Sequence, residues 1–324
     1  MRTFALQRRA KHLLYEIVAH ASQCYSAFVR SCVAILALAA CNEAAPPPKA
    51  APAAPAHPVA TADAATAACE QLPFAENSPV HEASGAAWLD IDGKLMLVVI
   101  SDSGNQGEYA IIEPESGTTR ERGKLPLGKT ASDDVEGLAS RGDKLYGLTS
   151  AGWMRVWQRK GKGFDLVDGP YAIGPVDAQS KSGGKAPKGV GNVCPANLGN
   201  CGRNFEGLAM SPTAAYACAK TDGRLYPLAE HDGRFVADFT KSVAVTKPDS
   251  LGDCAFSDRG VLLVGDNWFG QVYRVDGTTV TPVAQLGIGF PEVIAARGDV
   301  VYRMSDMGGS PSLMAKFRCP AIAR

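Results

Sequence analysis

Carboxylate side chains recur in this sequence within a short phrase that appears five times. The phrase consists of an acidic or polar residue, a small residue and an apolar run, as in Asp134-Val135-Glu136-Gly137-Leu138-Ala139. Carboxylate oxygens gathered from several such phrases could bind a hard divalent cation, either calcium or magnesium. The five copies begin at Glu82, Asp134, Asn204, Ser250 and Phe290. The first chemistry that the sequence suggests is therefore cation binding.

The spacing of the phrase indicates the fold that positions these residues. Its copies start about 40 to 70 residues apart, which is typical of the four-stranded blades of a β-propeller. Short apolar runs separated by turns, such as the hairpin signal Asp92-Gly93, follow each copy. We therefore predict an all-β fold, a β-propeller with five recognisable four-stranded blades. A sixth blade could lie between Val167 and Cys201, although an excursion over one face is the preferred interpretation of this segment. The segment from Cys69 to Pro79 is expected to add an outer strand to the last blade.

The opening strand of each blade lines the central channel of a propeller, and alternate residues of a strand share a face. The acids of the repeated phrase should therefore converge in the channel, where their repulsion favours a bound cation. Calcium is the cofactor we expect. The predicted ligands are Glu136, Glu206, Glu292, Asp134 and Asp253. The alternative is that these acids cap strand ends and accept hydrogen bonds from backbone amides of the next blade.

A second phrase places an aspartate at the end of a strand, as in Ser101-Asp102-Ser103-Gly104, and it returns at Asp266 and Asp306. An aspartate before a small residue stabilises a turn by bonding to its own backbone. The functional alternative is that these aspartates line one mouth of the channel.

The nine cysteines favour export. Cys24 and Cys32 lie in the leader and Cys41 is a candidate for lipidation, which leaves an even six for an oxidising compartment. Metal binding by these six is disfavoured, because they form no Cys-x-x-Cys pair and lie near no pair of histidines. Their positions predict the disulfides Cys69–Cys319, Cys194–Cys201 and Cys218–Cys254.

The N-terminal part divides into two segments. Residues 1–40 form a leader whose end, Leu38-Ala39-Ala40-Cys41, resembles the bacterial lipobox, so Cys41 would be lipidated. An ordinary secretory signal cut elsewhere is the alternative, and the long leader suggests a translation start near Val29 or Arg30. Residues 41–68 are rich in Ala and Pro and form a stalk, and residues 69–324 form the propeller. We expect an exported protein of the cell envelope, attached to the membrane by lipid and facing the periplasm or the surface.

The charge of the chain excludes one class of partner. Its 33 basic and 33 acidic side chains balance, and no basic cluster interleaved with aromatic residues indicates a nucleic-acid partner. The remaining partners are the membrane and an unknown small molecule or protein, and we expect a monomer.

The motifs resemble a known family. Glu-x-Ser-Gly at Glu82, Asp-x-Glu-Gly at Asp134, Asn-Phe-Glu-Gly at Asn204 and Pro-Glu-x-Ile-Ala at Pro291 are similar to those of the SdiA-regulated propellers, which are related to esterase-like phytase domains. The likeness covers most of residues 82–318. It implies a calcium-binding propeller of the bacterial envelope, with the metal role carried by Glu136, Glu206, Glu292 and Asp134. The chain departs from the pattern at Gly252-Asp253-Cys254 and at Val293.

Three functions remain open at this point. The first is a lipoprotein that binds calcium and a ligand or protein partner without turnover. The second is a metal-dependent esterase, lactonase or phytase-like phosphatase, in which Glu136 or Glu206 would act as the base. A cationic rim for its substrate could come from Lys181, Lys185 and Lys188, which are otherwise solvated loop lysines. The third is a structural docking platform. The sequence has no Gly-x-Ser-x-Gly motif and only five histidines, which argues against a Ser-His-Asp mechanism.

Overall fold

The computed structural model describes residues 69–181, 193–307 and 311–322, and β-strands are the main secondary structure of these residues. One 3-10 turn, Pro320–Ile322, follows the last strand. No helix in these ranges is long and apolar enough to cross a membrane. The predicted leader, the stalk, Cys41, Lys185 and Lys188 lie outside the described residues.

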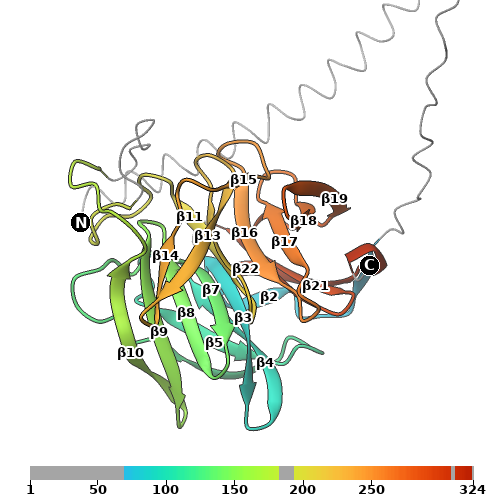
Figure 1. Ribbon diagram of the computed structural model, residues 1–324. Helices are drawn as coiled ribbons and strands as arrows, with labels where there is room; N and C mark the ends of the chain where they lie inside the picture. The colour runs from blue at the N-terminus through green and yellow to red at the C-terminus, as the bar shows by residue number, and fades with distance from the viewer. Residues whose placement is uncertain (1–68, 182–192, 308–310, 323–324) are drawn as a thin grey trace, which may run out of the picture. The chain divides into compact units, whose positions relative to one another are not determined.

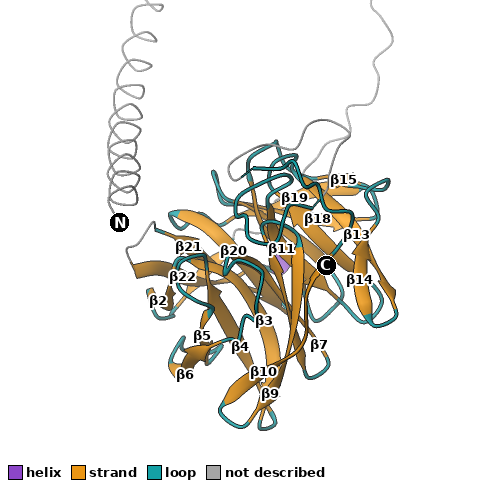
Figure 2. Cartoon of the chain, turned by 90° about the vertical axis from the view of Figure 1, so that its left-hand side faces the viewer, coloured by secondary structure: helices purple, strands orange, loops and turns teal. Residues whose placement is uncertain are grey.

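Five antiparallel sheets follow one another along the chain, and each forms one blade of a β-propeller (Figures 1 and 2). Blade one consists of β3 (Ala83–Ile91), β4 (Lys94–Ser101), β5 (Glu108–Ile112) and β6 (Thr119–Lys124). Blade two consists of β7 (Val135–Arg141), β8 (Lys144–Thr149), β9 (Trp153–Lys160) and β10 (Gly163–Ala172). Blade three consists of β11 (Phe205–Met210), β12 (Ala215–Ala219), β13 (Arg224–His231) and β14 (Arg234–Ala237), with β15 (Val243–Ala244) paired to β13.

Blades four and five complete the ring. Blade four consists of β16 (Leu251–Phe256), β17 (Leu262–Asp266), β18 (Gln271–Asp276) and β19 (Thr279–Gln285). Blade five consists of β20 (Phe290–Arg297), β21 (Val300–Asp306), β22 (Pro311–Arg318) and β1 (Glu70–Leu72), with β2 (Asn77–His81) also paired to β22. The first strands of successive blades contact one another, and β20 contacts β3. The prediction of an all-β propeller with five four-stranded blades is confirmed.

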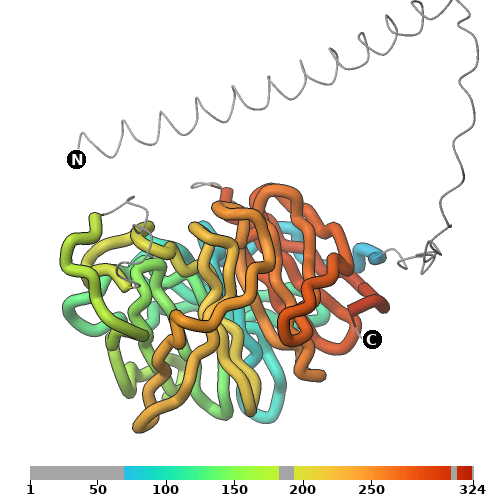
Figure 3. The backbone as a smooth tube through the Cα atoms, turned by 45° about the horizontal axis from the view of Figure 1, so that its top comes forward, coloured from blue at the N-terminus to red at the C-terminus, as the bar shows by residue number. Residues whose placement is uncertain are grey.

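The N-terminal segment of the described chain closes the ring. Strand β1 pairs with β22, so that Glu70 lies opposite Arg318, and Cys69 forms a disulfide with Cys319. In Figure 3 the blue start of the described chain lies beside the red strands near its end. The expectation that the segment from Cys69 to Pro79 adds an outer strand to the last blade is confirmed.

Between blades two and three the chain makes a long connection, which the sequence had placed between Val167 and Cys201. The structure shortens it, because β10 continues to Ala172. The disulfide Cys194–Cys201 closes a loop at its far end. The described residues of this connection form no further blade.

Each blade has a β-bulge at the same place, between its first and second strands. In blade two, for example, the register shifts between Val135 and Gly137, so that Glu136 is the extra residue. A bulge turns the extra side chain out of the regular alternation. The five bulged residues, here called the bulge ring, are Ser84, Glu136, Glu206, Gly252 and Glu292.

The glycine after the bulge allows the first strands to approach closely. A Cβ atom on Gly137 would lie 2.5 Å from the backbone nitrogen of Leu208 in the next blade. Only glycine fits such a contact between neighbouring strands. Apolar side chains such as Leu148, Phe205 and Tyr226 fill the space between the sheets of blades two and three. The bulge ring is therefore held on a close-packed inner wall.

The disulfide that closes the ring should contribute more to stability than the local one. The Cys69–Cys319 bond joins residues 250 positions apart, whereas Cys194–Cys201 spans 7. On the chain-entropy account the longer loop restricts the unfolded chain more. We expect Cys69→Ala/Cys319→Ala to lower the free energy of unfolding by about 2–5 kcal/mol. The loss should be larger than that caused by Cys194→Ala/Cys201→Ala. Urea denaturation under non-reducing conditions measures both. An equal or larger loss in the Cys194/Cys201 variant would contradict this.

Candidate functional site

Two sets of residues meet at the channel. The first is the bulge ring. The second lies where the second strand of each blade ends, and we call it the strand-end ring. The backbone N–H of such a residue donates a hydrogen bond to a carbonyl oxygen of the repeated phrase that opens the same blade, as Lys220 N does to Asn204 O at 2.9 Å. Its members are Asp102, Ser150, Lys220, Asn267 and Asp306.

Three acids from blades one and two come together in the channel. Asp102, Asp134 and Glu136 each offer a carboxylate oxygen, and these three oxygens lie within 4.8 Å of one another. Asp134 and Glu136 are buried, and Asp102 is half-buried. We call this group the acid triad. Oxygen atoms at such separations can share one divalent cation.

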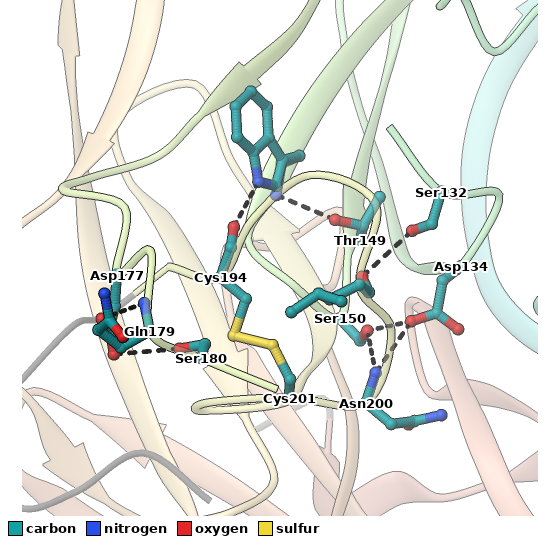
Figure 4. The surroundings of a disulfide bond; sticks show 12 residues. Ser132, Asp134, Thr149, Ser150, Asp177, Gln179, Ser180, Cys194, Asn200 and Cys201 are labelled. Atoms are coloured by element: carbon teal, nitrogen blue, oxygen red, sulfur yellow. Dashed lines mark hydrogen bonds between the residues drawn. A yellow bond between two sulfur atoms is a disulfide. The ribbon is translucent and has the colours of Figure 1, made fainter. Parts of the chain in front are cut away.

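The position of Asp134 is fixed by its surroundings, shown in Figure 4. The hydroxyl of Ser150 donates a hydrogen bond to Asp134 Oδ2, and the backbone nitrogen of Asn200 donates to the same oxygen at 3.3 Å. Asn200 belongs to the loop closed by Cys194 and Cys201. That loop is itself anchored, because Trp153 Nε1 donates to Cys194 O at 2.8 Å. The disulfide-closed loop therefore supports the acid triad from blade two.

Burial makes the triad retain protons. It raises the pKa of Asp102 to about 7, and the neighbouring charge of Asp134 adds to the rise. Burial raises the pKa of Glu136 well above its usual range, with further contributions from Asp102 and Glu206. Burial also raises the pKa of Asp134. The three groups cannot all ionise at neutral pH without a compensating positive charge.

The other two acids of the bulge ring, Glu206 and Glu292, already have a compensating positive charge beside them. Lys220 Nζ lies 3.1 Å from Glu206 Oε2 in its own blade and 3.1 Å from Glu292 Oε1 in blade five. Asn204 Nδ2 donates to the other oxygen of Glu206, and Asn267 Nδ2 donates to Glu292 Oε1 at 3.4 Å. Burial disfavours the charge of Lys220, but Glu206, Glu292 and Glu136 outweigh it and raise its pKa. Lys220 therefore remains a cation.

The structure thus divides the five predicted metal ligands. Asp134 and Glu136 join Asp102 in the triad, whereas Glu206 and Glu292 surround Lys220. Asp253 belongs to neither group. It occupies the place of the glycine in the repeat, and its two oxygens accept hydrogen bonds from Cys254 N at 2.7 Å and from Ile294 N at 2.9 Å. Asp253 therefore connects blade four to blade five, as the alternative interpretation of these acids expected. Burial raises its pKa well above the usual value.

Two functional residues were not among the predicted ligands. Asp102 was noted only as a turn or rim residue, and in the structure it is also one of the three acids of the triad. Lys220 was not noted at all, although aligning the strand ends Ser101-Asp102 and Ala219-Lys220 would have found it. The equivalent position in the repeat was the available signal for Lys220. It was missed because blade one has an acidic residue at this position and blade three has a basic one.

Comparison with known proteins assigns neither a family nor an activity to this chain. No family model matches the chain, and no curated protein is similar to it in sequence. Among solved structures, the PQQ-bound aldose sugar dehydrogenase of Streptomyces coelicolor is 14% identical, with a TM-score of 0.46 over 78% of this chain and 98% of that one. The glutaminyl cyclase of Myxococcus xanthus is 16% identical, with a TM-score of 0.45 over 78% and 97%. At these levels of similarity no activity can be transferred. The predicted likeness to the SdiA-regulated propellers stays a prediction.

The protons retained by the triad should make the stability of the metal-free protein fall as the pH rises from about 4 to 7. The folded state keeps the Asp102 proton up to about pH 7, whereas an unfolded aspartate releases it near pH ~3.9. Between these values the folded state binds more protons, so this group's contribution to the free energy of unfolding falls as the pH rises. Relative to Asp102→Asn, the wild type should therefore lose stability between about pH 4 and pH 7.

Thermal unfolding with a chelator present measures this effect. The difference in Tm between wild type and Asp102→Asn should shift in favour of the variant as the pH rises. Glu76→Gln is the control, because Glu76 is exposed and lies outside both rings. A difference that stays constant from pH 4 to pH 8 would contradict the assignment.

Proposed function

We propose that this protein is an exported, lipid-anchored protein of the cell envelope whose propeller binds one calcium ion at the acid triad and a ligand or protein partner at the channel mouth. The observation that carries the proposal is the convergence of Asp102, Asp134 and Glu136 within 4.8 Å. The three disulfides support export, because such bonds persist in oxidising compartments. Lipidation of Cys41 follows from the lipobox resemblance alone.

The chemistry of the triad favours calcium. Its ligand atoms are carboxylate oxygens from two blades, and calcium accepts six to eight oxygens in flexible geometry. Magnesium demands near-octahedral geometry and keeps several waters. An ion with two positive charges would replace the protons that burial imposes on the triad. Asp102, Asp134 and Glu136 would hold the ion, and Ser150 and Asn200 would orient Asp134 as they do in the structure.

The channel mouth at blade four has features of a binding surface. Trp268 and Phe269 are 57% and 68% exposed, and they directly follow Asn267 of the strand-end ring. Asp266 Oδ1 accepts hydrogen bonds from both of their backbone nitrogens, and Trp268 Nε1 donates to Asp249 O at 2.8 Å. The Trp268 ring also packs edge-on against Phe290. An exposed aromatic side chain that is already fixed in place, as that of Trp268 is, offers contact area at little cost in conformational entropy.

Binding without turnover is favoured over hydrolysis. A hydrolase needs a base that is free to accept a proton beside the ion. Glu206 is already bonded to Lys220 and Asn204, and Glu136 is needed as a ligand. Among the described residues the histidines are His81 and His231, and neither belongs to the two rings. The site would therefore hold an ion beside a surface, while neither of the glutamates expected to act as the base, Glu136 and Glu206, is free to do so.

Calcium should stabilise the protein through the triad. Binding to the folded state alone adds about 2.7 kcal/mol when the ion is at 100 times its Kd, so Tm should rise with calcium and fall with chelator. Asp102→Asn/Glu136→Gln should abolish the response, because it removes two of the three charged ligands. Differential scanning calorimetry in chelator and in about 10 mM calcium, which exceeds the ~0.1–1 mM dissociation constants of extracellular calcium modules, measures the shift.

Glu76→Gln serves as the matched control and should respond as the wild type does. Magnesium at equal concentration should give a smaller rise. A wild-type Tm that is the same in calcium and in chelator would refute the calcium site. So would an unchanged calcium response in the double variant.

A further inference from the structure

The bulge ring has one position without a side chain. Blade four contributes Gly252, whereas blades two, three and five contribute glutamates. Lys220 comes from blade three, and its ammonium contacts Glu206 there and Glu292 in blade five. Its side chain therefore reaches past the blade whose ring residue is glycine.

The ammonium lies among oxygen atoms of the kind that bind metal ions. Besides the carboxylates of Glu206 and Glu292, the amide side chains of Asn204 and Asn267 belong to this group through their bonds to those glutamates. The Oδ1 atoms of both asparagines are buried, and no hydrogen-bond donor among the described residues reaches them. Asn267 is only 5% exposed. A buried carbonyl oxygen without a partner costs free energy, and a cation would satisfy it.

We propose that this half of the channel is a second divalent-cation site, formed by Glu206, Glu292, Asn204 and Asn267, which Lys220 fills from within. Lys220 thereby limits the channel to one exchangeable ion, the ion at the acid triad. The inference rests on the proposed function for the ion at the triad, but the second site is defined by its own residues. We call it the lysine-filled site.

The physical reason is that a tethered ammonium competes with a free ion at no cost in translational entropy. Lys220 directly follows β12 and is always present at the site, so calcium can enter only by displacing a cation already bonded to two carboxylates. Removing the ammonium would leave two carboxylates and, on the two asparagines bonded to them, two amide oxygens without a partner, and oxygen ligands of this kind suit calcium.

The test is the number of calcium ions bound by the full chain, measured by isothermal titration and by equilibrium dialysis. We expect one ion in the wild type and two in Lys220→Met, which removes the charge while keeping an unbranched side chain. Lys220→Arg retains a cation and should bind one. Lys220→Met/Glu206→Gln/Glu292→Gln removes both carboxylates of the lysine-filled site and should return the count to one.

The outcomes separate this inference from the proposed function. One ion in both wild type and Lys220→Met would overturn the lysine-filled site and leave the triad intact. No ion in the wild type and one in Lys220→Met would overturn the triad and support the lysine-filled site. No ion in either would overturn both. If Lys220→Met does not fold, Lys220→Gln provides the same comparison with a polar side chain, and a count of one in that variant overturns the inference.

Discussion

The constraint on which the rest of this structure depends is the crowding of carboxylates around the axis of a narrow propeller. Each blade places its bulged residue at the centre, and three of the five are glutamates. Like charges in a buried space must be neutralised by protons, by a lysine or by a metal ion. The protein uses a lysine on one side, at Lys220. On the other side, the carboxylates of Asp102, Asp134 and Glu136 can be neutralised either by protons or by a metal ion, depending on the pH and on the ion concentration.

The backbone creates this crowding by repetition. The bulge in every blade turns one side chain inward, and the glycine that follows lets the next blade approach until only backbone fits between the strands. Where that glycine is replaced, as at Asp253, one carboxylate oxygen accepts a hydrogen bond from Ile294 N of the next blade and the other from Cys254 N of its own blade. The bulge position therefore gives a candidate ligand at Glu136 and a gap at Gly252, and the position after it gives an interblade bond at Asp253.

Much of this architecture could be predicted from the sequence, because the repeated phrase encodes it directly. The blade number and the disulfides followed from the spacing of motifs and the positions of the cysteines. Except in blade five, the outermost strands could not be recognised; β6, Thr119–Lys124, for example, is a polar edge strand with no apolar run. The sequence also did not show how the predicted ligands divide between the acid triad and the residues around Lys220. That division depends on whether Lys220 reaches Glu292 across blade four, and contacts between blades leave no local pattern in the chain.

The measurement that tests the account most directly is a crystal structure of the calcium-loaded protein, recorded at an X-ray wavelength where calcium scatters anomalously. The account predicts one anomalous peak within coordination distance of Asp102, Asp134 and Glu136, with Lys220 still bonded to Glu206 and Glu292. The absence of a peak at the triad would contradict it. A peak between Glu206 and Glu292 with Lys220 displaced would contradict it as well.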